Sequence, residues 1–134
     1  MTQITSDGLF TTVVERTLPF WGSTGDVSDP GKVVEMLDFT DKEIAIASRI
    51  QQNQVKLRGK IPDELIKHIK AWAFLLERVA QFFGGDQEKT VRWFKTPNYQ
   101  LGGVEPRNFI LFGRARKLME IVDYAVSENA HKNQ

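Results

Sequence analysis

The feature that most constrains this fold is a long amphipathic stripe in the middle of the chain. Six large apolar residues recur there at alternating steps of four and three: Leu65, Ile69, Trp72, Leu76, Val79 and Phe83. That spacing places all six on one face of a helix, which is predicted to run from about Pro62 to Phe83. Gly84 and Gly85 follow it and favour its termination. We expect this helix to pack against two or more partners and to form the spine of the fold.

Other segments show helix start signals, and none shows the alternation of a β-strand. Asp29 precedes Pro30 as a candidate N-cap, and Thr40 with Glu43 forms a capping-box pattern. The remaining predicted helices cover residues 30–37, 41–48, 51–57, 87–95 and 106–112, and a last helix follows Gly113. The sequence therefore predicts an all-α fold.

Length and composition favour a small globular protein. The chain has 134 residues, enough for one compact domain or for two small helical units that share a core. It has no cysteine, which excludes disulfides, thiolate zinc sites and cysteine nucleophiles. No apolar run reaches the roughly 18 residues that a membrane span needs, and the N-terminus does not resemble a signal peptide. We expect a cytoplasmic protein that does not contact a membrane.

Catalytic motifs are missing from the sequence. The two histidines, His68 and His131, lack the spacing of a metal-binding motif, and no phosphate-binding GxxxxGK pattern follows a strand. No residue is placed beside a plausible general base as a nucleophile would be. The sequence predicts neither an enzyme nor a cofactor or metal site.

Charge is unevenly distributed, although the net charge is only +1. Residues 1–39 hold six acidic and two basic residues, whereas residues 41–60 hold five basic and two acidic residues. A local basic patch of this kind suits either nucleic acid or an ordinary solvated helix face.

The basic patch coincides with the spacing of a helix-turn-helix. In that motif a small residue, a turn residue and two apolar residues recur at the spacing of Ala45, Arg49, Ile50 and Val55. The second helix, 51–57, would present polar side chains to DNA. The predicted DNA-binding residues are Lys42, Gln51, Gln52, Gln54, Lys56, Arg58 and Lys60. Arg49 departs from the motif, which usually has glycine at the turn, and two packed helices without a DNA role remain an alternative.

A second informative segment spans residues 93–103. Trp93 and Phe94 end a helical pattern, Pro97 stops the helix, and Gly102 with Gly103 permits a tight turn. Leu101 is expected to be buried against Trp93. The segment therefore predicts a rigid connector that is able to present its backbone to a neighbouring protein.

The order W-x-x-TPN-x-x-LGG-x-x-P resembles the C-terminal toxin-binding domain of the Xre/MbcA/ParS antitoxin family. Its residues include Trp93, Thr96, Pro97, Asn98, Leu101, Gly102, Gly103 and Pro106, followed by Ile110, Gly113, Arg114, Lys117 and Leu118. The resemblance covers about residues 80–126, and residues 30–80 resemble that family's Xre-type helix-turn-helix region more weakly. It implies a helix-turn-helix region with the spine helix (29–80) and a small helical toxin-binding domain (81–134). Residues 1–28 show no sustained hydrophobic period and match no part of that family, so we expect an N-terminal arm that is partly disordered. The polar tail from Glu128 onward is expected to fray.

The resemblance implies an antitoxin of a type II toxin–antitoxin pair, without a cofactor. Such proteins occlude the active-site cleft of a RES-domain toxin that consumes NAD or uses it to modify proteins, and many dimerise and repress their own operon. The expected partners are thus a RES-domain toxin, operator DNA and a second copy of the chain. The expected toxin-binding residues are Asn98, Leu101, Gly102, Gly103, Arg114, Arg116 and Lys117. A stand-alone transcriptional regulator and a protein-binding adaptor without a toxin remain alternatives.

Overall fold

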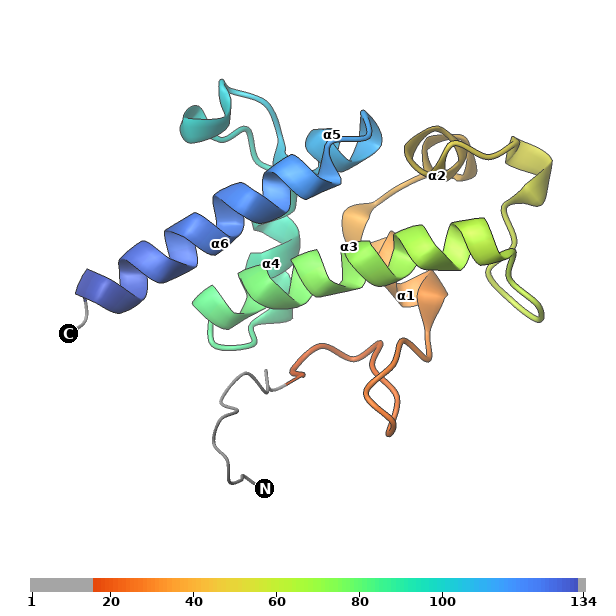
Figure 1. Cartoon of the computed structure of the whole chain (residues 1–134), viewed down its shortest axis with the longest axis horizontal. Coiled ribbons are helices and arrows are strands. Elements are labelled where there is room, and N and C mark those ends of the chain that lie inside the picture. Colours follow the sequence, from red (N-terminus) through yellow and green to blue (C-terminus); the bar gives the residue numbers. More distant parts are fainter. Residues whose placement is uncertain (1–15, 133–134) are drawn as a thin grey trace.

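The computed structural model of the chain describes residues 16–132, with side chains up to residue 128. These residues form an all-helical fold, as the sequence predicts (Figure 1). The α-helices are α1 (Pro30–Leu37), α2 (Asp41–Ser48), α3 (Asp63–Phe82), α4 (Gln87–Phe94), α5 (Pro106–Leu111) and α6 (Ala115–Lys132). Two turns of 3₁₀-helix, η2 (Gln52–Gln54) and η3 (Tyr99–Leu101), lie between them. No strand forms in this part of the chain, and no helix in it is long and apolar enough to cross a membrane.

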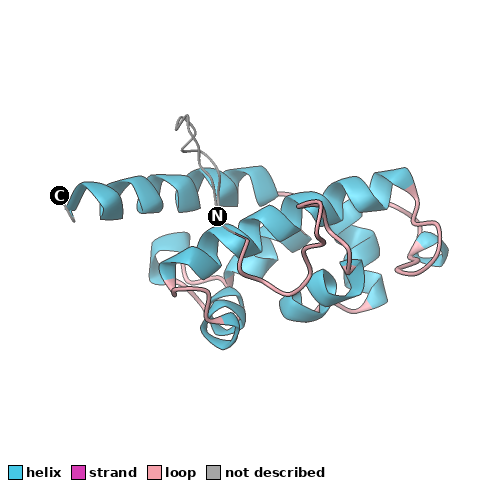
Figure 2. Ribbon diagram, turned by 90° about the horizontal axis from the view of Figure 1, so that it is seen from below, coloured by secondary structure: helices cyan, strands magenta, loops and turns pink. Residues whose placement is uncertain are grey.

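The predicted spine is α3, a helix of 20 residues. It contacts α1, α2, α4 and α6, and α2 also packs on α5 (Figures 1 and 2). Burial follows the predicted stripe: Leu65, Ile69, Trp72, Leu76 and Val79 are each at most 1% exposed. All of this apolar surface leaves water on folding, so the stripe is the main source of stability for the arrangement.

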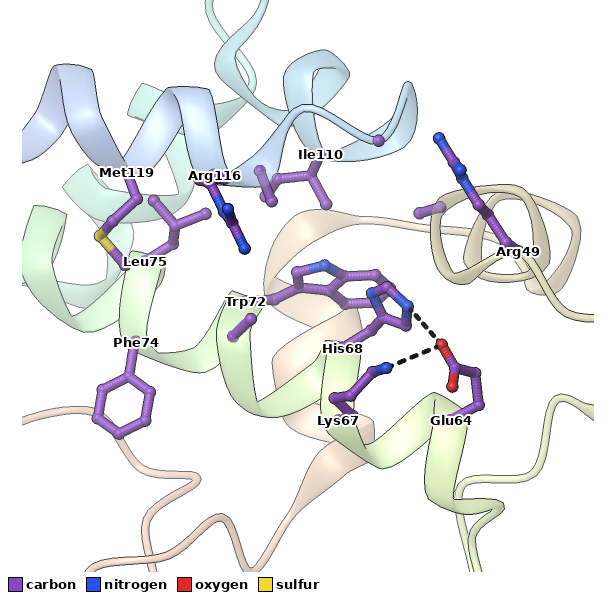
Figure 3. A pocket seen from close by; sticks show the side chains of 14 residues that line it. Arg49, Glu64, Lys67, His68, Trp72, Phe74, Leu75, Ile110, Arg116 and Met119 are labelled. Atoms are coloured by element: carbon purple, nitrogen blue, oxygen red, sulfur yellow. Dashed lines mark hydrogen bonds and ion pairs between the residues drawn. The ribbon is translucent and has the colours of Figure 1, made fainter.

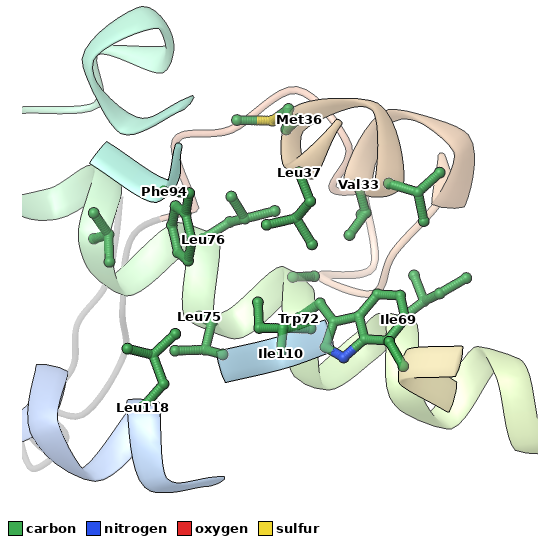
Figure 4. Close-up of a cluster of buried hydrophobic side chains, with 14 of the residues drawn as sticks. Val33, Met36, Leu37, Ile69, Trp72, Leu75, Leu76, Phe94, Ile110 and Leu118 are labelled. Carbon is green, nitrogen blue, oxygen red and sulfur yellow. The ribbon is translucent and has the colours of Figure 1, made fainter. Parts of the chain in front are cut away.

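One continuous core joins the two halves that the sequence suggests. Figure 4 shows Leu37 of α1, Trp72 of α3, Phe94 of α4, Ile110 of α5 and Leu118 of α6 converging on it. Since these side chains come from both sides of residue 80, the region 29–80 and the region 81–134 are packed around the same cluster.

The predicted helix starts are formed as their sequences indicate. The side chain of Asp29 accepts a hydrogen bond from the backbone N–H of Lys32, 3.1 Å away. At α2 the two bonds of the capping box between Thr40 and Glu43 are both present. These bonds satisfy N–H groups that have no partner inside the helix, and they fix where each helix begins.

The helix predicted over residues 51–57 is wrong in extent. A single 3₁₀ turn, Gln52–Gln54, forms instead, and the backbone is extended at Gln51 and Val55. The turn has no side-chain cap, and none of its residues is buried. Without a cap or an apolar face to bury, so short a helix is not stable. The second helix of a helix-turn-helix is therefore missing, although Arg49 does adopt the left-handed backbone expected at the turn, with φ 61°.

The described part of the N-terminal arm is packed on α3 through a buried carboxylate. Leu18 and Phe20 are buried, and Glu77 of α3 is only 1% exposed. One oxygen of Glu77 accepts hydrogen bonds from the backbone N–H groups of Thr17 and Leu18 and from the indole N–H of Trp21, at 2.8–3.1 Å. The other accepts from the Thr17 hydroxyl at 2.7 Å and from the Gln81 amide at 3.3 Å. Residues 1–15, where the sequence suggests disorder, lie outside the described residues.

The C-terminal helix is longer than the sequence suggests. Fraying was expected from Glu128 onward, but α6 continues to Lys132. Its central part is held to α3 by Arg78, which donates two hydrogen bonds to one carboxylate oxygen of Asp123 at 2.8 and 3.0 Å. In both views the C-terminal turns of α6 project beyond the rest of the fold (Figures 1 and 2).

Candidate protein-binding site

The TPN and LGG residues build a closed loop between α4 and α5. The backbone N–H of Asn98 donates to the carbonyl of Val104 at 3.0 Å, and the N–H of Gly103 donates to the carbonyl of Asn98 at 2.9 Å. The Asn98 side chain also accepts a bond from the N–H of Gln100. Gly102 and Gly103 have φ values of 78° and 83°, which a residue with a side chain adopts only with strain. The sequence of this loop therefore specifies its shape.

The loop is anchored from inside and exposed at its tip. Leu101 is buried, as predicted, and it lines a cavity of about 270 Å³ together with Trp93 and residues of α3 and α6. Tyr99, two residues earlier, is 95% exposed. A rigid loop with an exposed aromatic tip is suited to contact another protein.

The basic residues at the start of α6 are exposed but lie apart from that loop. Arg114 places its guanidinium 4.8 Å from the ring centre of Phe109, and Lys117 lies 4.0 Å from the carboxylate of Glu120. Arg116 lines a different, larger groove. The seven predicted toxin-binding residues therefore form two groups along α6, a loop group near its middle and a cationic group at its start.

The groove beside Arg116 has a volume of about 790 Å³. Four helices line it, namely α2, α3, α5 and α6 (Figure 3). The lining residues are Ala47, Arg49, Glu64, Lys67, His68, Ala71, Trp72, Phe74, Leu75, Ile110, Gly113, Ala115, Arg116 and Met119. Its floor is mostly apolar, and its rim carries three cations and a histidine against one carboxylate.

The single carboxylate of the rim is already paired. Glu64 lies 3.3 Å from the ammonium of Lys67 and 3.2 Å from Nε2 of His68. The hydrogen bond and charge of Lys67, with a smaller contribution from His68, hold the pKa of Glu64 below its ordinary value. Arg49 and Arg116, in contrast, have no carboxylate partner among the described residues.

Arg49 reaches the groove because Gly113 leaves room for it. A Cβ atom at Gly113 would lie 3.0 Å from a guanidinium nitrogen of Arg49. In the view of Figure 3, Ile110 and Trp72 lie between Arg49 and Arg116. No sequence pattern indicates this groove: Arg49 stands out only as a departure from the helix-turn-helix pattern, and Lys67 does not stand out. The small residues Ala47, Ala71 and Ala115 are the one sequence feature that fits a groove, but small residues leave open space only where the packed helices do not fill it.

The seven predicted DNA-binding residues are all exposed. Lys42 lies in the first turn of α2, and the other six lie in or beside the extended segment 51–60. Among the described residues none of the four cations Lys42, Lys56, Arg58 and Lys60 forms an ion pair. They are therefore free to contact phosphate groups, but no helix presents the glutamines.

A scan against protein-family models gives no match to the chain, and a search of curated proteins finds no similar sequence. Among the side chains of residues 16–128 no group of three or more metal-ligating residues comes together.

Proposed function

We propose that this chain is the antitoxin of a type II toxin–antitoxin pair, and that it binds and occludes a RES-domain toxin. The observation that carries the proposal is the loop of residues 98–104. The motif residues that resemble the antitoxin family have coherent structural roles there: Asn98 closes the loop, Leu101 anchors it, and the two glycines adopt left-handed turns.

The shape of α6 supports inhibition by insertion. Its C-terminal turns project from the body of the molecule, and Tyr124 on this part is 69% exposed. A projecting helix is able to enter an active-site cleft, while Arg114, Arg116 and Lys117 at its start contact the rim of that cleft. Arginine is suited to this role because its guanidinium makes two hydrogen bonds to a carboxylate.

Growth rescue tests the proposal. The adjacent gene is expected to encode a RES-type toxin, and co-expression of the chain should restore growth to cells that produce it. Arg114→Glu combined with Lys117→Glu should abolish the rescue. Lys89→Glu combined with Arg92→Glu, the same charge change at exposed sites on α4, should leave it intact. Rescue that is lost equally in both double variants, or absent with the unaltered chain, would refute the proposal.

A DNA-binding regulator, alone or as an autorepressor with the toxin, is the second candidate. The exposed cations of residues 42–60, which have no ion-pair partner among the described residues, favour it. Since a single 3₁₀ turn replaces the predicted recognition helix, the contacts would be mainly to phosphates. Lys56→Ala combined with Arg58→Ala should then weaken binding to all DNA sequences and reduce the salt dependence of the affinity. An unchanged salt dependence would exclude this role. An adaptor that binds another protein through the same loop is the remaining alternative.

A further inference from the structure

The groove between α3 and α6 combines an apolar floor with a cationic rim. We propose that it binds an acidic, amphipathic peptide segment of a partner protein, with an apolar side chain on the floor and carboxylates at Arg49 and Arg116. This inference goes beyond the proposed function, because it holds for any partner that presents such a segment.

The floor has the size and character of a side-chain pocket. Ala71, Phe74, Ala115 and Met119 are the lining residues that offer open apolar surface, above the buried Trp72 and Leu75. The volume of about 790 Å³ is in the range of known ligand pockets. Filling it with apolar side chains would remove apolar surface from water, which is the main source of affinity when an amphipathic segment enters a groove.

The rim selects for negative charge. Its one carboxylate, Glu64, is occupied by Lys67 and His68. The two guanidinium groups have no such partner among the described residues, so they are available to a ligand. Carboxylates of a docking segment would meet them with paired, charge-assisted hydrogen bonds.

The backbone of Arg49 points to the same use. Its left-handed conformation, φ 61° and ψ 43°, ends α2 where glycine would be favoured. Strain of this kind that persists in a folded protein suggests that the side chain serves a purpose other than stability. At Arg49 that purpose is to place a guanidinium beside Gly113 at the edge of the groove.

A peptide fits the groove better than nucleic acid does. Phosphate backbones are recognised by cations on accessible surfaces, and an apolar floor does not contribute to that recognition. The cations suited to phosphate are the exposed Lys42, Lys56, Arg58 and Lys60, which do not line the groove.

Selection from a phage-displayed library of random peptides on the full chain tests the inference. The enriched peptide is then synthesised with a fluorescent label, and its affinity is measured by anisotropy. We expect an enriched pattern in which Asp or Glu flanks large apolar residues, and an affinity that falls as salt is raised. Arg116→Glu and Ala71→Glu should each weaken binding at least about tenfold, which corresponds to about 1.4 kcal/mol.

Two further variants complete the experiment, one as a control and one as a test of Arg49. Thr24→Glu, which adds the same charge as Ala71→Glu at an exposed site away from the groove, should not change the affinity. Arg49→Gly keeps the fold, since glycine suits the backbone there, but should also lose affinity at least about tenfold.

Several outcomes would overturn the proposal. They are a selection that enriches no peptide, an enriched peptide without acidic residues, and binding that survives both Ala71→Glu and Arg49→Gly. Duplex DNA that binds at these residues in place of the peptide would assign the groove to nucleic acid. None of these outcomes depends on a toxin, so failure here is distinct from failure of growth rescue.

Discussion

Arg49 has a left-handed backbone conformation, which is unfavourable for arginine. Its side chain lies beside Gly113, which is far away in the sequence. Left-handed backbone costs a residue with a Cβ atom about 1–2 kcal/mol, and glycine avoids this cost. Asp38 also has a positive φ, 58°, but aspartate tolerates this region better than arginine does. Of the described non-glycine residues with positive φ, Arg49 is therefore the one whose conformation needs a reason.

We predict that Arg49→Gly stabilises the fold. The free energy of unfolding should rise by up to about 1 kcal/mol, because the strain is relieved while some backbone entropy is lost. Urea denaturation measures this change, with Asp38→Gly as the matched control that should gain less. A clear loss of stability in Arg49→Gly would mean that the guanidinium holds the helices together, and would remove the strain argument.

Glu77 is the residue that fixes the N-terminal segment. Its carboxylate accepts hydrogen bonds from five donors, three of them in Thr17 and Leu18. In Glu77→Gln the negative charge is lost, so the bonds from the three N–H groups are no longer charge-assisted, and the Thr17 hydroxyl must turn to accept from the new NH₂ group. We predict a loss of about 1–3 kcal/mol in the free energy of unfolding, measured by urea denaturation.

The matched control is Glu88→Gln, which makes the same change at an exposed site on α4. Amide hydrogen exchange at Thr17 and Leu18 should accelerate in Glu77→Gln and not in Glu88→Gln. Equal stability and equal exchange in the two variants would show that the segment is held by Leu18 and Phe20 alone.

Whole helices were predictable where the sequence carries a cap or a long apolar stripe. The helices that start at Pro30 and Asp41 have a side-chain cap, the spine helix has a long stripe without such a cap, and all three form. The segment 51–57 has neither a cap nor a stripe: Val55 and Leu57 are spaced as in an extended chain, and the glutamines have nothing to bury. A short polar segment adopts the conformation that its surroundings allow, and the local pattern does not contain that information.

The two candidate surfaces also differ in how far they could be predicted from the sequence. The loop of residues 98–104 is specified by its own sequence, since Pro97 restricts the backbone before it, Asn98 bonds to the backbone inside it, and Gly102 with Gly103 permits positive φ. The groove is built from four helices, and the contact of Arg49 with Gly113 joins positions far apart in the chain. No local pattern predicts such a site, because it exists only after α3 and α6 have packed.

A pH-sensitive ion pair ties the end of α1 to the end of α4. Lys95 lies 3.0 Å from the carboxylate of Asp38, and its hydrogen bond and charge lower the pKa of Asp38. A lowered folded-state pKa means that the pair stabilises the fold above the ordinary pKa of aspartate and that this contribution is lost as the pH falls through the folded-state value. Since the pair is exposed to water, its effect on overall stability is small.

We predict that Lys95→Met raises the pKa of Asp38 toward its ordinary value. Titration of the Asp38 carboxyl carbon by NMR measures the change. Lys89→Met, which removes the same charge from α4 without breaking the pair, is the control and should shift it less. An Asp38 pKa that is the same in the unaltered chain and in Lys95→Met would contradict the assignment.

In the whole molecule, the two candidate binding surfaces are built on one core. The central helix α3 lines the groove with Trp72 and Leu75, and it supports α6 through Arg78 and Asp123. The exposed loop and the central part of α6 are therefore held in place by the core. This arrangement suits an inhibitor, because a preorganised surface loses little entropy on binding.

Co-purification tests most simply whether this chain binds a RES-domain toxin directly, as we propose. The tagged chain and the untagged RES-type protein encoded beside it are produced together and passed over an affinity column at moderate salt. We predict that both proteins elute together and remain together in size-exclusion chromatography. A toxin that is soluble but passes through the column while the tagged chain is retained would contradict the account.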